Sequence, residues 1–233
     1  MGISLYLAMT AAEISACDTL PDMLAYMACH FSPYTTGLSN IPNTLPPQSV
    51  LIVNDRTPIC GHDHKLIAYQ LSQALEALQC GSLLLDFQRP DNPETEALCQ
   101  YLTQQITRPI GISAPFAAGL DCAVFLPPCP PDTLLEDHLA PWKGREIWLE
   151  TAADFTKITV DKQGSHYACA PADPSIELPH TDPELICHYR IDLTDSSAVF
   201  TLGRADEDTA LLLKKAEALG VTQCFGLWQE LCK

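Results

Sequence analysis

The sequence predicts an α/β protein, a distorted (β/α)8 TIM-like barrel with β-hairpin insertions in its C-terminal third. Short β-rich runs alternate with longer segments of helical periodicity, the pattern of a parallel sheet covered by helices. Several of these runs are apolar at nearly every position, as residues 50–53 are, which is typical of strands buried on both faces. Residues 158–204 instead have the alternation and turns of antiparallel hairpins. With 233 residues, 47% of them hydrophobic, the chain can bury a substantial core, and we expect one domain over residues 1–233.

The predicted strands of the barrel are short and carry few charges. They cover residues 3–9, 50–54, 82–87, 109–113, 122–126, 146–150 and 222–227. The segment between the fourth and fifth of them, residues 113–121, is shorter than a helical crossover normally requires. We therefore expect one barrel helix to be reduced to a turn.

The predicted helices are recognised by their starts and by a buried stripe. Asp63 is a good N-cap for a helix over residues 64–79, which is apolar at i, i+3 and i+4 spacing. Asn92 followed by Pro93 starts a second helix. A third opens at Asp206 or Glu207 and ends before Gly220, and residues 20–31 fit a helix better than a strand.

Two hairpins are predicted in the C-terminal third. Residues 158–169 contain a Lys-Gln-Gly turn, and residues 189–202 contain a Thr-Asp-Ser turn between two alternating runs. Such antiparallel additions distort a regular barrel.

Charge and cysteine content exclude several classes of protein. Thirteen Lys and Arg against 29 Asp and Glu leave a net charge of −16, which repels nucleic acid and anionic membrane surfaces. The 11 cysteines include no CxxC pair, which argues against a disulfide framework or a zinc ribbon. The apolar run at residues 1–9 is not preceded by Lys or Arg, and the first basic side chain of the sequence is Arg56. We therefore interpret this run as a strand and not as a signal segment. These features favour a cytoplasmic protein.

Polar residues follow the predicted strands, where the working residues of parallel α/β folds gather. Carboxylates and guanidinium groups pair with hydroxyls, and an indole ring stacks on a sugar, so this edge suits a polar ligand. The alternative is that these acids cap helices or pair with the two Arg. The residues at the edge are Asp55, Arg56, Asp86, Gln88, Arg89, Glu150, Trp228 and Glu230.

Residues 81–88, Gly-Ser-Leu-Leu-Leu-Asp-Phe-Gln, resemble the strand that carries the Asp-x-Asp-x-Glu motif of family 18 glycoside hydrolases and their degenerate relatives. Trp228 is similar to the Trp that floors the sugar site in that family. Of the motif, only Asp86 keeps its carboxylate, while Leu84 replaces an Asp and Gln88 replaces the general-acid Glu. An amide cannot protonate a glycosidic oxygen. The resemblance therefore implies a barrel related to sugar-handling enzymes whose family chemistry has been lost or moved.

If the chemistry has moved, a second pair of carboxyl groups must flank the reacting bond. Glu150 with Asp86, or Glu230 with Asp55, could supply such a pair from different strands. Asp86, Glu150 and Glu230 are therefore the candidate catalytic residues. The candidate ligand-binding residues are Asp55, Arg56, Gln88, Arg89 and Trp228.

A second constellation is His62-Asp63-His64, which resembles the His-x-His metal motif of the amidohydrolases. The remaining histidines of that family's pattern are missing. In the other interpretation, Asp63 caps the long helix and both His62 and His64 are solvated.

The leading hypothesis is a glycoside-hydrolase-like barrel that binds a carbohydrate or another polar ligand at the strand C-terminal ends, without the family's acid catalyst and without a cofactor. If the protein is an enzyme, we expect a hydrolase of the glycosidase type. The alternatives are a metal-dependent hydrolase that uses His62 and His64, and a non-catalytic interaction protein. We expect a small-molecule or carbohydrate partner, with no nucleic acid and no membrane, and the oligomeric state is left open.

Overall fold

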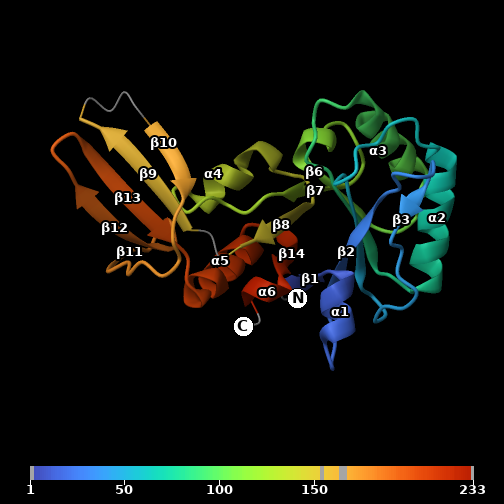
Figure 1. Cartoon of the computed structure of the whole chain (residues 1–233), viewed down its shortest axis with the longest axis horizontal. Helices are drawn as coiled ribbons and strands as arrows, with labels where there is room; N and C mark the ends of the chain where they lie inside the picture. Colours follow the sequence, from blue (N-terminus) through green and yellow to red (C-terminus); the bar gives the residue numbers. More distant parts are fainter. Residues whose placement is uncertain (1–2, 153–154, 163–166, 232–233) are drawn as a thin grey trace. The chain divides into compact units, whose positions relative to one another are not determined.

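The computed structural model describes residues 3–152, 155–162 and 167–231 (Figure 1). These residues form two compact units. The barrel unit consists of the described residues within 1–127, 144–150 and 221–233. The hairpin unit consists of those within 128–143 and 151–220. The division into compact units does not test whether residues 1–233 fold as one domain, so that expectation stays a prediction.

The barrel unit is built on eight parallel strands that close on themselves. Neighbouring strands are hydrogen-bonded in the order β1-β14-β8-β7-β6-β5-β4-β2, and β1 also pairs with β2, which completes the ring. The predicted distorted (β/α)8 barrel is therefore confirmed. The strands are β1 (Ser4–Met9), β2 (Leu24–Phe31), β4 (Val50–Asn54), β5 (Ser82–Asp86), β6 (Ile110–Ser113), β7 (Ala123–Leu126), β8 (Ile147–Thr151) and β14 (Val221–Leu227).

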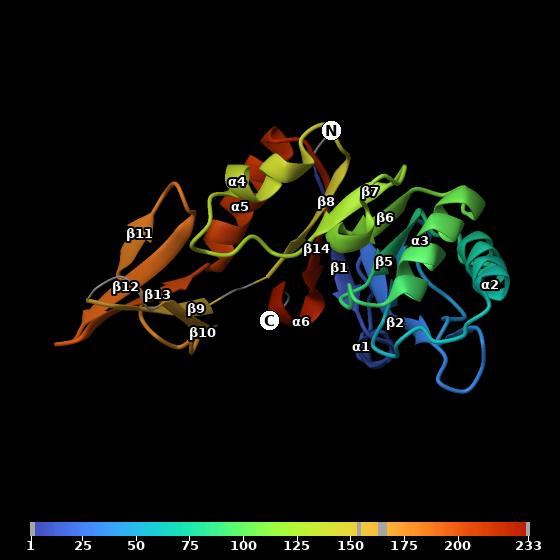
Figure 2. The same cartoon turned by 90° about the horizontal axis from the view of Figure 1, so that it is seen from above.

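The connections of the barrel unit are uneven. Helices α1 (Ala11–Ala16), α2 (His64–Ala77) and α3 (Pro93–Gln105) follow β1, β4 and β5, and Figures 1 and 2 show α2 and α3 side by side. The two-residue strand β3 (Leu38–Ser39) lies antiparallel to β2. Between β6 and β7 the chain forms only the single turn η1 (Ala114–Phe116), as the short spacing predicted. The short helix α6 (Trp228–Leu231) follows β14.

The helical interpretation of residues 20–31 is wrong, because Leu24–Phe31 is the second strand of the barrel. It pairs in parallel with β1 on one side and β4 on the other. Leu24, Ala25 and Tyr26 are consecutive and all buried, as in a strand covered on both faces. Such a run satisfies helical spacing as well, so periodicity could not separate the two structures. Asp86 consequently ends the fourth strand of the barrel instead of the third.

The helix starts follow the sequence closely. The Asp63 side chain accepts a hydrogen bond from the Lys65 amide at 2.9 Å at the start of α2. Asn92 accepts one from the Glu94 amide at 3.0 Å at the start of α3, with Pro93 at the first helical position.

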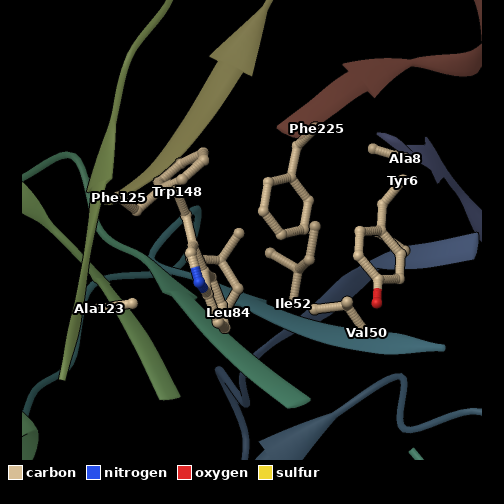
Figure 3. Close-up of a cluster of buried hydrophobic side chains, with 10 residues drawn as sticks. Tyr6, Ala8, Val50, Ile52, Leu84, Ala123, Phe125, Trp148 and Phe225 are labelled. Carbon is tan, nitrogen blue, oxygen red and sulfur yellow. The ribbon is translucent and has the colours of Figure 1, made fainter. Parts of the chain in front are cut away.

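Aromatic side chains fill the interior of the barrel around Phe225 (Figure 3). The Phe225 ring stacks on Tyr6 at 5.5 Å between ring centroids and meets the edge of Phe125 at 5.6 Å. Trp148 lies on its other side at 5.7 Å. Gly111 on β6 makes room for this indole, because a Cβ there would lie 2.2 Å from the Trp148 ring. The interior of the barrel around Phe225 is thus a packed core.

The hairpin unit contains a five-stranded antiparallel sheet in the order β10-β9-β13-β12-β11. Both predicted hairpins are confirmed, β9 with β10 and β12 with β13. The second turn is closed by the Thr194 amide, which donates to the Ser197 carbonyl at 2.9 Å. Gln163 and Gly164 of the first turn lie outside the described residues. The strands are β9 (Phe155–Asp161), β10 (Tyr167–Pro171), β11 (His180–Asp182), β12 (Cys187–Leu193) and β13 (Ser197–Gly203).

The hairpin unit also contains the helices α4 (Leu135–Leu139), η2 (Ala140–Trp142) and α5 (Asp206–Ala218). The α5 helix begins one residue after Ala205, as predicted, and Gly220 follows it with a φ of +92°. The buried Asp208 accepts a hydrogen bond from the Ala205 amide at 2.8 Å and contacts His188 Nδ1 at 2.8 Å. These contacts fix the first turn of the helix.

The nine cysteines whose side chains the structure describes are all free thiols. Within the described residues, no helix combines the length and the apolar character needed to cross a bilayer.

Candidate functional site

The barrel unit contains a cavity of about 580 Å³ at the carboxyl ends of its strands. Its floor is apolar, because it is formed by inward-facing side chains of the core. Its walls are polar, because the residues that follow at the strand ends are mostly polar or charged. The register pairs Asn54 at the end of β4 with Asp86 at the end of β5. The lining includes Ala8, Thr10, Met27, His30, Asn40, Ile52, Asn54, Asp55, Arg56, Leu84, Asp86, Gln88, Arg89, Phe125, Glu150, Phe225, Gly226 and Leu227.

Asp86 is the inward-facing carboxylate at the end of β5. It accepts a hydrogen bond from Gln88 Nε2, and the Ser113 hydroxyl lies 3.4 Å from the same oxygen, Oδ1. Burial raises the pKa of Asp86 above its ordinary value, and the nearby Asp55 charge raises it further, whereas Gln88 and Ser113 counteract the shift. The two donors thus favour the ionised form of a carboxyl group that burial disfavours.

Glu150 at the end of β8 is the most perturbed acid of the cavity. Burial raises its pKa to about 7, and the charges of Asp86 and Glu230 contribute to the same shift. A carboxyl group with this pKa is partly protonated near neutral pH, so Glu150 can act as a proton donor or as a hydrogen-bond donor to a ligand.

Asp55 has a positioning role. It is buried, and its Oδ2 accepts hydrogen bonds from the backbone amides of Gln88 at 3.1 Å and Arg89 at 3.0 Å. These bonds hold the segment that follows β5 against the end of β4. The sequence predicts that Asp55 binds the ligand, but its carboxylate is hydrogen-bonded to the loop that carries two other candidate ligand-binding residues, Gln88 and Arg89.

Arg56 and Arg89 are exposed side chains on neighbouring loops of the cavity wall. Arg89 Nη2 donates to the Arg56 carbonyl at 3.2 Å. The Arg56 amide in turn donates to Asn54 Oδ1 at 3.1 Å, and Asn54 Nδ2 donates to the Met27 carbonyl at 2.9 Å. A chain of hydrogen bonds therefore connects the middle of β2, the end of β4 and the loop after β5.

Two predicted site residues lie outside the cavity lining found among the described residues. Trp228 and Glu230 belong to α6, which begins directly after Leu227, and β14 lines the cavity through Phe225, Gly226 and Leu227 instead. Because the chain turns into α6 after Leu227, Trp228 and Glu230 no longer belong to β14 and do not line the cavity. Glu230 is still near enough for its charge to raise the pKa of Glu150.

Sequence reasoning missed the residues that β2 and the following loop contribute. His30, Met27 and Asn40 line the cavity, and His30 Nδ1 lies 3.0 Å from the Ala28 carbonyl. A polar residue at a strand end was the feature that could have identified His30, since it lies one residue before the end of β2. It was hidden because this segment was interpreted as a helix.

The geometry of His62 does not support the metal-dependent alternative. Its Nδ1 accepts a hydrogen bond from the Cys60 amide and its Nε2 lies 3.0 Å from the Ser32 carbonyl, so both ring nitrogens are engaged with backbone. His64 begins α2 and packs near Tyr101, with 6.1 Å between ring centroids. In the described part of the chain, no three His, Cys, Asp or Glu residues are grouped to hold a metal ion.

Comparison with known proteins bears on the fold. No protein-family model matches the sequence, and no curated protein matches it. Solved structures do match: a family 18 N-acetylglucosaminidase from Paenibacillus barengoltzii has a TM-score of 0.58 and 9% identity, covering 97% of this chain and 94% of that one. A chitinase from Chromobacterium violaceum has a TM-score of 0.57 and 10% identity, covering 97% and 93%.

A family 18 chitinase from Cycas revoluta, determined in complex with (GlcNAc)4, has a TM-score of 0.57 and 12% identity over 96% of this chain and 94% of that one. Identities this low speak for the fold only. The fold is a TIM barrel like that of these solved structures, which confirms the structural part of the resemblance given at residues 81–88.

Proposed function

We propose that the barrel unit binds a carbohydrate in the cavity at the carboxyl ends of its strands. The observation that carries the proposal is the combination of an apolar, partly aromatic floor with polar and charged walls in a space of about 580 Å³. Pockets of this size are typical of small-ligand sites.

A sugar has the chemistry that this cavity complements. One face of the ring presents C–H groups, which pack against apolar side chains such as Phe125 and Phe225, while its edge presents hydroxyls. The Asp86 and Glu150 carboxyl groups accept hydrogen bonds from hydroxyls, and Gln88 can donate. Solved structures of the same fold include a chitinase bound to (GlcNAc)4, which makes chito-oligosaccharides the first ligands to test.

Gln88 takes the position of the general-acid Glu in the family motif, and its Nε2 donates to Asp86. Because an amide releases no proton at working pH, we propose that Gln88 positions the Asp86 carboxylate and that the family's acid catalyst is absent. Binding without hydrolysis is the leading form of the proposal.

The experiment is a titration of the purified protein with (GlcNAc)4 by calorimetry. Asp86→Asn should weaken binding at least tenfold, because it removes a charged acceptor from the cavity. Asp121→Asn is the matched control, since it makes the same change on an exposed residue in the turn before β7, and should leave binding unchanged. Melting temperatures establish that both variants are folded. If (GlcNAc)4 and tetrasaccharides that contain an acidic sugar all fail to bind, or if the Asp86→Asn and Asp121→Asn variants bind equally well, the proposal is overturned.

A second candidate, a working glycosidase, is favoured by one observation, the pKa of Glu150 near 7 beside Asp86. In this reaction Glu150 gives its proton to the glycosidic oxygen as the C–O bond breaks. A water molecule adds to the anomeric carbon and loses its proton to the Asp86 carboxylate. Asp86 suits the role of base because Gln88 and Ser113 support its ionised form.

Hydrolysis is tested by incubating (GlcNAc)4 with the protein and separating the products by chromatography. If Glu150 is the acid, Glu150→Gln should lower kcat about 100-fold or more with little change in ligand affinity, and the activity of the parent should fall as pH rises through about 7. Binding without any product would remove this candidate and leave the binding proposal intact.

A further inference from the structure

We infer that the ligand of this cavity is an acidic sugar, whose carboxylate is bound by the side chains of Arg56 and Arg89. The inference rests on the proposed carbohydrate-binding function and names its substrate class. It is carried by two guanidinium groups on the wall of a single cavity in a strongly acidic protein.

Basic side chains are scarce in the barrel unit, so their location is informative. The unit has Arg56, Lys65, Arg89, Arg108, Arg145 and Lys233, within a chain whose net charge is −16. Arg145 is engaged with the backbone, since its Nη2 lies 2.8 Å from the Leu120 carbonyl and 3.0 Å from the Cys122 carbonyl. Arg56 and Arg89, by contrast, line the same cavity.

Neither cavity arginine takes part in an ion pair among the described residues, whose salt bridges involve other side chains. Asp55, the acid next to Arg56 in the chain, directs its Oδ2 to the backbone amides of Gln88 and Arg89. Arg89 Nη2 is held by the Arg56 carbonyl, which fixes one guanidinium beside the residue that carries the other. Two cations on the wall of one cavity, neither of them in an ion pair among the described residues, repel one another, and a bound anion would relieve that repulsion.

The chemistry of the pair fits a carboxylate. A guanidinium group is planar, always charged, and presents parallel N–H donors that match the two oxygens of a carboxylate. Asp86 and Glu150 would repel the same group, so the carboxylate must lie on the Arg56 and Arg89 side while the hydroxyls face the acids. A neutral sugar could pair its hydroxyls with the two guanidinium groups but would leave their charges without an anion.

The test compares tetrasaccharides that differ in charge. (GlcNAc)4 is the neutral probe. The acidic probes alternate N-acetylglucosamine with glucuronic acid or with N-acetylmuramic acid, which place the carboxylate at different points of the ring, and each has a matching uncharged carboxamide. Calorimetric titrations at low and at high salt give the affinities.

We expect at least one acidic tetrasaccharide to bind about tenfold or more tightly than its carboxamide. Arg56→Gln and Arg89→Gln should each reduce this preference, with little effect on the carboxamide. Arg108→Gln is the control, because it removes the same charge from a residue outside the cavity lining.

The outcomes separate the two proposals. Equal binding of each acid and its carboxamide, or tighter binding of (GlcNAc)4 than of both acids, would overturn this inference and leave carbohydrate binding in place. If no sugar in the series binds, both proposals fail.

Discussion

One buried charged group in each unit shows an opposite way of treating buried charge, Arg204 in the hairpin unit and Glu150 in the barrel unit. In the hairpin unit, the buried guanidinium of Arg204 donates to the carbonyls of Cys129, Pro130, Leu185 and Ile186, the last of these at 3.1 Å. In the barrel unit, the Glu150 carboxyl group lies in the cavity. Burial is the leading cause of its raised pKa, and no hydrogen bond lowers that pKa.

The difference distinguishes a structural charge from a candidate functional one. Arg204 connects residues 129–130 with residues 185–186, and its hydrogen bonds offset the cost of removing it from water. Glu150 keeps most of that cost, which appears as a raised pKa. Groups left in this state are common at ligand sites, where a bound molecule supplies the missing partner.

The largest effect is expected from Arg204→Met. The change leaves several buried carbonyl groups without a donor, and we expect the free energy of unfolding to fall by about 3 to 5 kcal/mol. Urea unfolding followed by circular dichroism measures the loss. Arg190→Met is the matched control, because Arg190 and its partner Asp192 are both about half exposed and such pairs contribute less than about 1 kcal/mol. Similar losses for the two variants would show that the buried hydrogen bonds of Arg204 stabilise the hairpin unit no more than an exposed ion pair does.

Glu150→Gln should change stability in the other direction. Because the folded-state pKa of about 7 lies above the ordinary value of 4.5, the parent protein loses stability as pH rises through that range and remains weakened above it. The amide does not ionise, so at pH 8 the variant should be more stable than the parent by about 2 to 3 kcal/mol. Below pH 4.5 the gain should largely vanish.

Chemical unfolding at pH 4, 6 and 8 measures this difference. A variant that is less stable than the parent at pH 8 would show that the Glu150 carboxylate has a stabilising partner, and the contrast with Arg204 would then disappear.

A smaller effect is expected from Gln88→Glu. The substitution removes the Nε2 donor to Asp86 and adds a like charge beside it, so the melting temperature at pH 8 should fall by an amount equivalent to about 1 kcal/mol. The pKa of Asp86 should rise further, since one of the two groups that lower it is lost. The loss should shrink at acidic pH, where the new carboxyl is protonated. A pH-independent loss would instead indicate a packing defect.

Much of the site could be predicted from strand ends. Asp55, Arg56, Asp86, Gln88, Arg89 and Glu150 were all expected at the carboxyl edge, and all six line the cavity. Trp228 and Glu230 were expected there too, but α6 begins at Trp228 and carries them off the strand. A helix of four residues leaves too little periodicity in a sequence to be recognised.

The sequence by itself determined the closed parallel barrel, the shortened turn at residues 114–116 and the two C-terminal hairpins, because burial on two faces, spacing and turn residues are local properties. Only the tertiary structure decided that residues 24–31 form a strand, since that choice depends on pairing with β1 and β4. It also decided which acid is perturbed. The pKa of Glu150 is set by burial and by charges from β5 and α6, far away in the sequence, and no local pattern records them.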